Sequence, residues 1–313
     1  MTPRESLRLA LRRGKPSGPV PHLELEYQLT EITPGIEQIT LRAPMLEGVT
    51  SAARQDRLKR NAEMWVKVAE RFGWSCITGL HWLNVEDQCA SFEYIRELAG
   101  DTYMLSAFAD GTFGIPNGET MMDHVIWLRE QEEEALATAQ RHLDAATARL
   151  RTLVSAGAEV VFMCADYCFN DGPFLSPTMF AKFVTPFLTQ QADHIRAFGA
   201  FSVKHTDGNI MPILDQLVDS GVDALHSLDP MAGVDIAEVK RLYGDRIALI
   251  GNVNCAWVQA GTKEQIERSA RYCLEHGGAA QGGYVYATSN CIFEGVPLEN
   301  YEWMLKIREE YAT

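Results

Sequence analysis

His205 and Asp207 lie two residues apart in the segment FSVKHTDGN. The segment starts as a short apolar run and continues into a Gly-Asn turn and a helix-forming stretch. Residues i and i+2 of an extended chain project to the same side, so both side chains can face one site. An apolar strand that ends in such a pair just before a helix is typical of the active face of a βα barrel. The pair therefore predicts an enzyme in which His205 and Asp207 bind a ligand or carry a proton.

Further side chains of metal-binding type follow later apolar runs. Asp229, Cys255 and Cys291 come after three different candidate strands, and neighbouring strands lie ~5 Å apart in a sheet. Together with His205, these three side chains could hold one zinc ion and leave a position open for substrate. The chain lacks the short CxxC and HExxH motifs that identify zinc sites from sequence alone. Free cysteines also serve as small buried apolar residues, and this alternative stays open for Cys255 and Cys291.

Other residues at the ends of predicted strands could bind substrate. Glu24 and Glu26 share one face of the first strand, and two carboxylates inside a barrel need a proton, a cation or a donor between them. Alternatively, both point outward into the helix layer. His81 and Trp82 could supply a donor and an aromatic wall, and Asp166 could act as an acid. The remaining predicted contacts to substrate are Tyr167, Phe169 and Asn170.

The elements that would position these side chains are eight apolar runs of strand length, which alternate with longer segments of helical period. The predicted strands are residues 20–27, 75–80, 102–108, 159–165, 201–205, 223–228, 247–253 and 282–288. This pattern predicts one domain, residues 1–313, folded as a single (β/α)8 TIM barrel with an N-terminal helical extension. Spacing alone leaves a doubly wound open sheet as the alternative.

Capping residues and composition predict several helices. Residues 119–156, rich in Glu, Ala, Leu and Arg, predict one short and one long extra helix between the third and fourth strands. Ser176 followed by Pro177 predicts a helix start. Thr262 and Gly277 predict the start and the stop of another helix.

Composition excludes several classes of function. The chain has 313 residues, of which 46% are apolar, enough for one large core. Its formal charge of −14 opposes binding to nucleic acid or to anionic lipid. The basic N-terminal segment lacks the features of a secretory signal, and no apolar run approaches the ~20 residues that span a bilayer. We expect a cytoplasmic protein, possible as a homodimer, whose seven cysteines stay reduced.

Several ordered blocks of the chain resemble the uroporphyrinogen decarboxylase superfamily. These blocks read CADYCFNDGPFLSPTMFAKFVTPFL, HTDGNIMPILDQLVDSGVDALHSLDP, LIGNVN and EGVPLENYEWML. The resemblance implies the barrel fold of that superfamily, which contains both decarboxylases of the haem pathway and corrinoid-linked methyltransferases.

The N-terminal strand favours the methyltransferase branch of this superfamily. True decarboxylases carry there an arginine-rich RQAGRYLPEY-type segment that grips the many carboxylates of the substrate, and an aspartate in the next strand region. This chain reads VPHLELEYQLTE, with Glu24 and Glu26, and then GLHWLN after the second strand. Negative charge at this place would repel a polyanionic tetrapyrrole by several kcal/mol.

The resemblance to methyltransferases implies zinc, held by a His-x-Cys pair on strand five and a later cysteine near strand eight. His205 matches the histidine, Asp207 stands where the first cysteine is expected, and Cys291 lies near the second. The chain thus departs from the pattern at Asp207. Demethylating members that act on methyl ethers are similar in having acidic N-terminal strands and altered ligands, which a set of Asp229, Cys255 and Cys291 would suit.

The resemblance therefore implies a methyltransferase of the O-demethylase type. A methyl group would pass from a methyl ether, such as a methoxylated aromatic compound, to the Co(I) of a corrinoid protein, while zinc polarises the ether oxygen. His205, Asp166 and Asp207 would be the catalytic residues. Trp82, Tyr167 and Phe169 would form an aromatic cup around the ring.

The corrinoid would belong to a partner protein, because the chain has no cobalamin-binding signature such as DxHxxG. The direction of methyl transfer is not readable from these residues. A metal-free carbon–carbon lyase of the decarboxylase type and a noncatalytic binding subunit are the alternatives.

Overall fold

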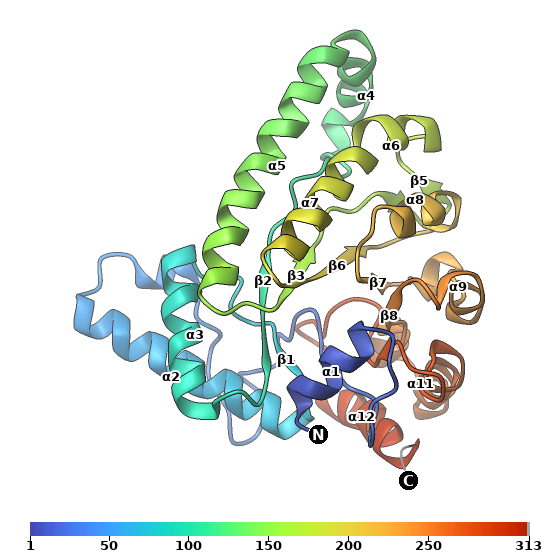
Figure 1. Ribbon diagram of the computed structural model, residues 1–313. Coiled ribbons are helices and arrows are strands. Elements are labelled where there is room, and N and C mark those ends of the chain that lie inside the picture. Colours follow the sequence, from blue (N-terminus) through green and yellow to red (C-terminus); the bar gives the residue numbers. More distant parts are fainter. Residues whose placement is uncertain (312–313) are drawn as a thin grey trace.

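The computed structural model describes residues 1–311 and shows an α/β fold built on a curled parallel sheet (Figure 1). Within these residues, seven strands pair in parallel in the order β1-β2-β3-β6-β7-β8-β9. They are β1 (Cys76–Ile77), β2 (Met104–Phe108), β3 (Val160–Met163), β6 (Phe201–Thr206), β7 (Ala224–Ser227), β8 (Ala248–Gly251) and β9 (Tyr284–Val285). A separate antiparallel hairpin consists of β4 (Cys168–Phe169) and β5 (Gly172–Pro173). Because the order of the large sheet never reverses, it differs from a doubly wound sheet.

The first predicted strand, residues 20–27, does not form a regular strand. Instead, His22 makes isolated parallel bridges with Trp74, next to β1, and with Tyr286, next to β9. The segment therefore lies between the two edges of the seven-stranded sheet and links them. Pro19 and Pro21 explain its irregularity, since neither has an N–H group to donate to a ladder. The other seven predicted strands are confirmed, although each differs by some residues from its predicted bounds.

Helices follow the strands and cover the outside of the sheet (Figure 1). The α-helices are α1 (Pro3–Leu11), α2 (Ser51–Phe72), α3 (Val85–Ala99), α4 (Met121–Glu130), α5 (Glu132–Ser155), α6 (Pro177–Phe183), α7 (Thr185–Ala197), α8 (Leu214–Asp219), α9 (Ile236–Tyr243), α10 (Cys255–Ala260), α11 (Lys263–Gly277) and α12 (Leu298–Tyr311). Short 3-10 helices are η1 (Ala43–Leu46), η2 (Gly118–Thr120), η3 (Met211–Ile213) and η4 (Pro230–Ala232). The predicted short and long extra helices are confirmed as α4 and α5, which project beyond the sheet (Figure 1).

Two predicted helix starts are confirmed at the level of the cap. The Ser176 side chain accepts a hydrogen bond from the Met179 N–H, and Pro177 is the first residue of α6. Thr262 caps α11 in a reciprocal capping box with Gln265. The end of α11 is one residue later than predicted, because Gly278, with φ of 118°, and not Gly277, takes the left-handed conformation that ends the helix.

The inside of the curled sheet is filled by alternate residues of the strands, as the two-residue period requires. Val160, Phe162 and Val203 belong to this buried interior cluster, and Leu7 and Leu11 of α1 pack into the same cluster. Contacts of α1 and of Arg12, which caps its C-terminus, reach the starts of β2, β3 and β6. The Arg4 N–H donates to the Thr102 carbonyl at 2.9 Å, Arg8 pairs with Glu159, and the Arg12 guanidinium lies 5.9 Å from the Phe201 ring centre. Helix α1 therefore covers the end of the curled sheet where the strands begin.

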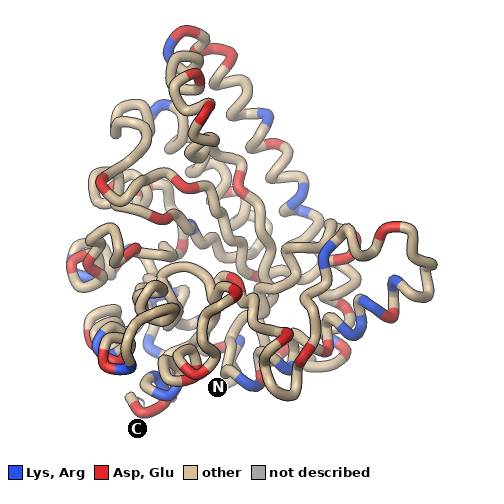
Figure 2. The backbone as a smooth tube through the Cα atoms, turned by 180° about the vertical axis from the view of Figure 1, so that it is seen from behind, with Lys and Arg blue, Asp and Glu red and all other residues tan. Residues whose placement is uncertain are grey.

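Charged residues lie mostly on the outer helices, where acidic and basic positions are interspersed (Figure 2). Acidic residues dominate in number, with 42 Asp and Glu against 28 Lys and Arg. None of the helices within residues 1–311 combines the length and the apolar character that crossing a bilayer demands.

Candidate functional site

Polar side chains replace the apolar interior residues at the carboxyl ends of β3 and β6. Val160 and Phe162 face the interior, so the two-residue period directs Asp166 to the same side beyond the end of β3. On the neighbouring strand β6, Val203 is followed on that side by His205 and then by Asp207.

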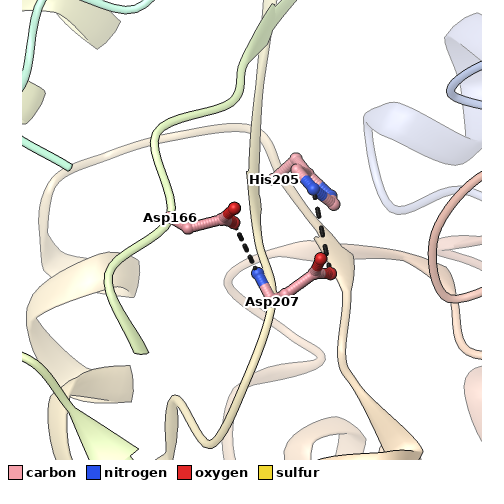
Figure 3. Close-up of side chains that lie close together, drawn as sticks. All are labelled: Asp166, His205 and Asp207. Atoms are coloured by element: carbon pink, nitrogen blue, oxygen red, sulfur yellow. Dashed lines mark hydrogen bonds and ion pairs between the residues drawn. The ribbon is translucent and has the colours of Figure 1, made fainter. Parts of the chain in front are cut away.

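Asp166, His205 and Asp207 each offer a ligand atom within 4.8 Å of the other two, and in the described part of the chain they form the one group of this kind (Figure 3). The Asp207 N–H donates to Asp166 Oδ1 at 2.9 Å. His205 Nε2 lies 3.8 Å from Asp207 Oδ1, beyond hydrogen-bond distance (Figure 3). Sequence analysis named these three residues as catalytic, and the structure brings them together.

Asp207 is held in place by donors from two other strand ends. Ser227 Oγ donates to its Oδ1 at 2.8 Å, and Asn290 Nδ2 donates to its Oδ2 at 2.6 Å. Ser227 has a φ of 81°, a left-handed conformation that is uncommon outside glycine and is often found at functional sites. Burial, with help from the neighbouring charges of Asp166 and Asp229, raises the pKa of Asp207 to about 6, although both donors oppose this rise. A cation bound here would relieve the repulsion between these carboxylates.

His205 is paired with a second buried histidine, His226, on the adjacent strand β7. The two residues stand opposite each other in the β6–β7 register, and their Nδ1 atoms are 2.7 Å apart. Burial lowers the pKa of both rings, that of His205 to about 3. Both imidazoles are therefore neutral at physiological pH.

A buried ion pair behind the sheet fixes the loop that carries Asp166. Lys204 is fully buried and points away from the interior; its Nζ donates to Asp110 Oδ2 at 2.7 Å and to the Ala165 carbonyl at 2.7 Å. Asp110 also accepts from the Thr112 hydroxyl at 2.6 Å and the Ala165 N–H at 2.9 Å. Burial alone would raise the pKa of Asp110, but Lys204 and these donors hold it below its usual value. Lys204 was not among the residues predicted from the sequence. A lysine inside the apolar run FSVKH is the signal that could have indicated a buried ion pair.

The predicted zinc set of Asp229, Cys255, Cys291 and His205 is not gathered into a compact group. Of the four, the structure places His205 alone in the group with Asp166 and Asp207. Asp229 begins η4, where its carboxylate accepts from the N–H groups of Met231 at 2.8 Å and Gly208 at 3.3 Å. These contacts engage the Asp229 carboxylate with the backbone, while its negative charge also raises the pKa of the Cys255 thiol.

The thiols of Cys255 and Cys291 border the site. Burial raises the pKa of both, and the negative charge of Asp207 adds to this rise in each case. Cys291 is 8% exposed and packs in the interior cluster. Cys164, which sequence analysis left without a role, is an exposed thiol at the end of β3.

Glu24, predicted to bind substrate, lies on the outer face of its segment. Its neighbours Leu23 and Leu25 pack in the interior cluster, and Glu24 is fully buried with Oε2 accepting from the Thr288 hydroxyl at 2.6 Å and the Thr288 N–H at 3.2 Å. Its Oε1 has no hydrogen-bond partner and lies 3.8 Å from His22 Nε2. Burial raises the pKa of Glu24 to about 8. Glu24 therefore points outward into the helix layer, which was the alternative to a position facing the substrate.

Glu26, His81 and Trp82 lie together at the carboxyl ends of the first strands. Glu26 and Trp82 line a cavity of about 710 Å³, in which the Arg42 guanidinium covers the Trp82 ring at 4.3 Å. The His81 ring lies 4.7 Å from the Trp82 ring and 4.5 Å from that of Phe108, and its Nε2 is 3.8 Å from Glu26 Oε2. Glu26, Trp82 and Arg42 thus line a side pocket with acidic, aromatic and basic walls, and His81 packs behind the Trp82 ring.

Tyr167, Phe169 and Asn170 were predicted to bind substrate, the first two in an aromatic cup with Trp82. Tyr167 is 3% exposed, and its hydroxyl hydrogen-bonds the Thr112 hydroxyl at 2.6 Å, while Lys204 Nζ lies 4.0 Å from its ring centre. Phe169 is 41% exposed on β4, and Asn170 belongs to the turn that follows. Tyr167 is thus buried beside the Lys204 ammonium, and the aromatic cup stays a prediction.

The fold and the site define a class of α/β proteins in which polar side chains gather at the carboxyl ends of curled parallel strands. Residues 88–311 match the family model of uroporphyrinogen decarboxylase (URO-D). This match covers more than half of the chain, and the chain belongs to that family, as the resemblance in sequence implied.

Curated relatives include proteins from both branches of the superfamily. The chain is 29% identical over 170 residues to the methylcobamide:CoM methyltransferase MtaA of Methanosarcina barkeri, covering 54% of this chain and 46% of that protein. It is 26% identical over 193 residues to a uroporphyrinogen decarboxylase of Coxiella burnetii, covering 58% of this chain and 49% of that protein. The chain thus spans about half the length of the curated relatives it matches.

Solved structures agree on the fold. A methyltransferase from Methanosarcina mazei superposes with a TM-score of 0.75 at 19% identity over 100% of both chains. A B12-independent methionine synthase from Shewanella sp. W3-18-1 follows with a TM-score of 0.56 at 11% identity over 96% of both chains.

Proposed function

We propose that this protein is a corrinoid-dependent methyltransferase that moves a methyl group from a methyl ether to the Co(I) of a partner corrinoid protein, with zinc as the resident metal. The proposal rests on one observation: the carboxylates of Asp166 and Asp207 and the neutral imidazole of His205 meet at the mouth of the barrel. The kinship with a methylcobamide-using methyltransferase supports it.

The residues of this group fit a divalent zinc ion. Zinc binds imidazole nitrogen and carboxylate oxygen, and a catalytic site keeps a position open. His205 Nε2 has no partner within hydrogen-bond distance, since its neighbour Asp207 Oδ1 is 3.8 Å away. Burial and the charges of Asp166 and Asp229 raise the pKa of Asp207 to about 6 despite its two donors, and a bound cation would offset this rise. His205, Asp207 and Asp166 would hold the ion, and Cys291 and Cys255 stay predicted ligands at its border.

When bound, zinc would polarise the ether oxygen and stabilise the negative charge that develops on it. An ion held by oxygen-rich ligands is harder than one held by thiolates, and it prefers an oxygen partner over a thiol. The replacement of the family's cysteine by Asp207 therefore favours an ether as methyl donor.

The protein itself orients the reacting groups. Ser227 and Asn290 fix the Asp207 carboxylate through two hydrogen bonds, so that little reorganisation is needed during the reaction. Asp166 would hold the ion through its carboxylate, whose Oδ1 also accepts the Asp207 N–H at 2.9 Å and so ties the two ligands together. The pocket of Glu26 and Trp82 would hold the organic part of the donor, with the Trp82 indole as its aromatic wall.

A metal-free carbon–carbon lyase is the second candidate, and kinship with a uroporphyrinogen decarboxylase favours it. The charges at the mouth oppose it. Glu26, Asp166, Asp207 and Asp229 all lie at the carboxyl ends of the strands, where a polycarboxylate substrate would be repelled.

The test combines metal analysis with a transfer assay. Purified protein should contain zinc, and with a Co(I) corrinoid protein and a panel of methoxylated aromatic compounds it should produce the absorption spectrum of methyl-cobalt. Asp207→Ala should lose the metal and the transfer. Glu63→Ala, which removes an exposed carboxylate of α2, is the matched control and should keep both. A metal-free protein that decarboxylates a tetrapyrrole would instead establish the lyase.

A further inference from the structure

The imidazole rings of His205 and His226 meet inside the curled sheet at a distance that requires a hydrogen bond between them. The Nδ1 atoms of His205 and His226 are 2.7 Å apart, and the two residues are 5% and 1% exposed respectively. Two N–H groups would clash at this distance, and two lone pairs would repel. One ring therefore donates and the other accepts.

The proposed metal site decides which ring donates. His205 Nε2 is the nitrogen that faces the site, 3.8 Å from Asp207 Oδ1, and a ring nitrogen binds a metal only when it carries no proton. A neutral imidazole has one N–H group, so the proton of His205 lies on Nδ1. His205 Nδ1 then donates and His226 Nδ1 accepts, while His226 Nε2, which has no hydrogen-bond partner among the described residues, carries the proton of His226.

Packing keeps the two rings in this relation. The Phe162 ring meets the His226 ring edge to face, with centres 6.4 Å apart and planes at 89°. The strands β6 and β7 hold the two residues in direct register. His226 makes no contact with Asp166 or Asp207 among the hydrogen bonds of the site, so it acts through His205.

We propose that His226 is a positioning residue, which accepts the Nδ1–H of His205 and thereby leaves His205 Nε2 bare and aimed at Asp166 and Asp207. A metal-binding imidazole commonly needs such a partner on its second nitrogen, which sets both its tautomer and its orientation. This inference rests on the proposed metal-dependent function, but its test measures metal binding and not turnover.

Two substitutions separate positioning from simple packing. In His226→Asn, the amide oxygen can stand close to the place of Nδ1 and accept the same proton. In His226→Leu, the volume is filled but no acceptor remains. The affinity for Zn²⁺, measured by competition with a chromophoric chelator, should fall about 10- to 100-fold in His226→Leu and should be largely retained in His226→Asn. Equal affinities of His226→Leu and the wild-type protein would overturn the proposal.

A second measurement needs no variant of His226. Nitrogen-15 chemical shifts of the metal-free protein labelled at histidine should show a protonated Nδ1 and a bare Nε2 for His205, with His205→Asn used to assign the signals. A protonated Nε2 would refute the proposed tautomer. If His226 controls metal affinity but no methyl-cobalt forms, the positioning role stands and the proposed transfer fails.

Discussion

At the scale of single residues, Glu24 shows how its surroundings change a carboxyl group. The sequence placed it with Glu26 on one strand face, but His22 and Glu24 turn to the helix layer. There the Tyr301 hydroxyl hydrogen-bonds His22 Nε2 at 3.0 Å, and Glu24 accepts from Thr288. A carboxyl group whose pKa is raised to about 8 keeps its proton in the folded protein at neutral pH.

This shift predicts a pH dependence of stability. Unfolded Glu24 titrates near 4.5 and folded Glu24 near 8, so the folded state binds the extra proton between these values. Its contribution is complete below pH 4.5 and is lost as the pH rises through 8. Glu24→Gln cannot ionise. At pH 9 it should exceed the wild-type free energy of unfolding by about 1–3 kcal/mol, and at pH 4 the two should be similar.

Urea unfolding at pH 4, 7 and 9 measures this effect. Glu63→Gln, at an exposed site of α2, should show no such trend. A stability difference for Glu24→Gln that stays constant across the three pH values would contradict the assigned pKa.

Site residues could be predicted from sequence where their direction follows from the strand that carries them. His205, Asp207 and Asp166 were predictable, because period and strand ends fix which way they point. The thiols were not, since the position of Cys255 at the start of α10 depends on where a loop ends. The roles of His226 and Ser227 depend on ring orientation and on a left-handed backbone, neither of which a residue type reveals.

At the scale of elements, the Lys204–Asp110 pair joins β6 to the loops after β2 and β3. Lys204→Met leaves a buried carboxylate without its cation and should lower the free energy of unfolding by about 3–5 kcal/mol. The double variant Lys204→Met, Asp110→Asn removes both charges and should lose less than the sum of the single changes. Denaturant unfolding of the four proteins tests this, and strictly additive losses would show that the two side chains do not interact.

Elements were predicted well wherever a local signal exists. Apolar runs in the sequence located all seven strands of the large sheet. The capping residues Ser176 and Thr262 located the starts of α6 and α11. Residues 20–27 were the exception. Apolar and polar residues do alternate in this segment. However, Pro21 has no N–H group, and Glu24 hydrogen-bonds Thr288 through its side chain, so only isolated bridges form. The alternation of residue types alone does not reveal these effects.

At the scale of the whole molecule, α1 is a structural part of the barrel. Leu7 is fully buried in the interior cluster, so Leu7→Ala should lower the free energy of unfolding by about 2–5 kcal/mol. Leu98→Ala, at a side chain that is 50% exposed on α3, should change it by less than about 0.5 kcal/mol. Thermal or urea unfolding compares them. A similar small effect for both would show that α1 is only loosely attached.

The position of α1 at the end where the strands begin also affects the order in which molecules could bind and leave. Molecules that bind at Asp166, His205 and Asp207 must enter and leave at the carboxyl ends of the strands, because Leu7 and Leu11 fill the opposite end. Under the proposed function, a small methyl donor would enter before the corrinoid protein covers this opening, and the demethylated product would leave only after that protein has dissociated. Catalysis at such a site would follow a compulsory order, with the small molecule first in and last out.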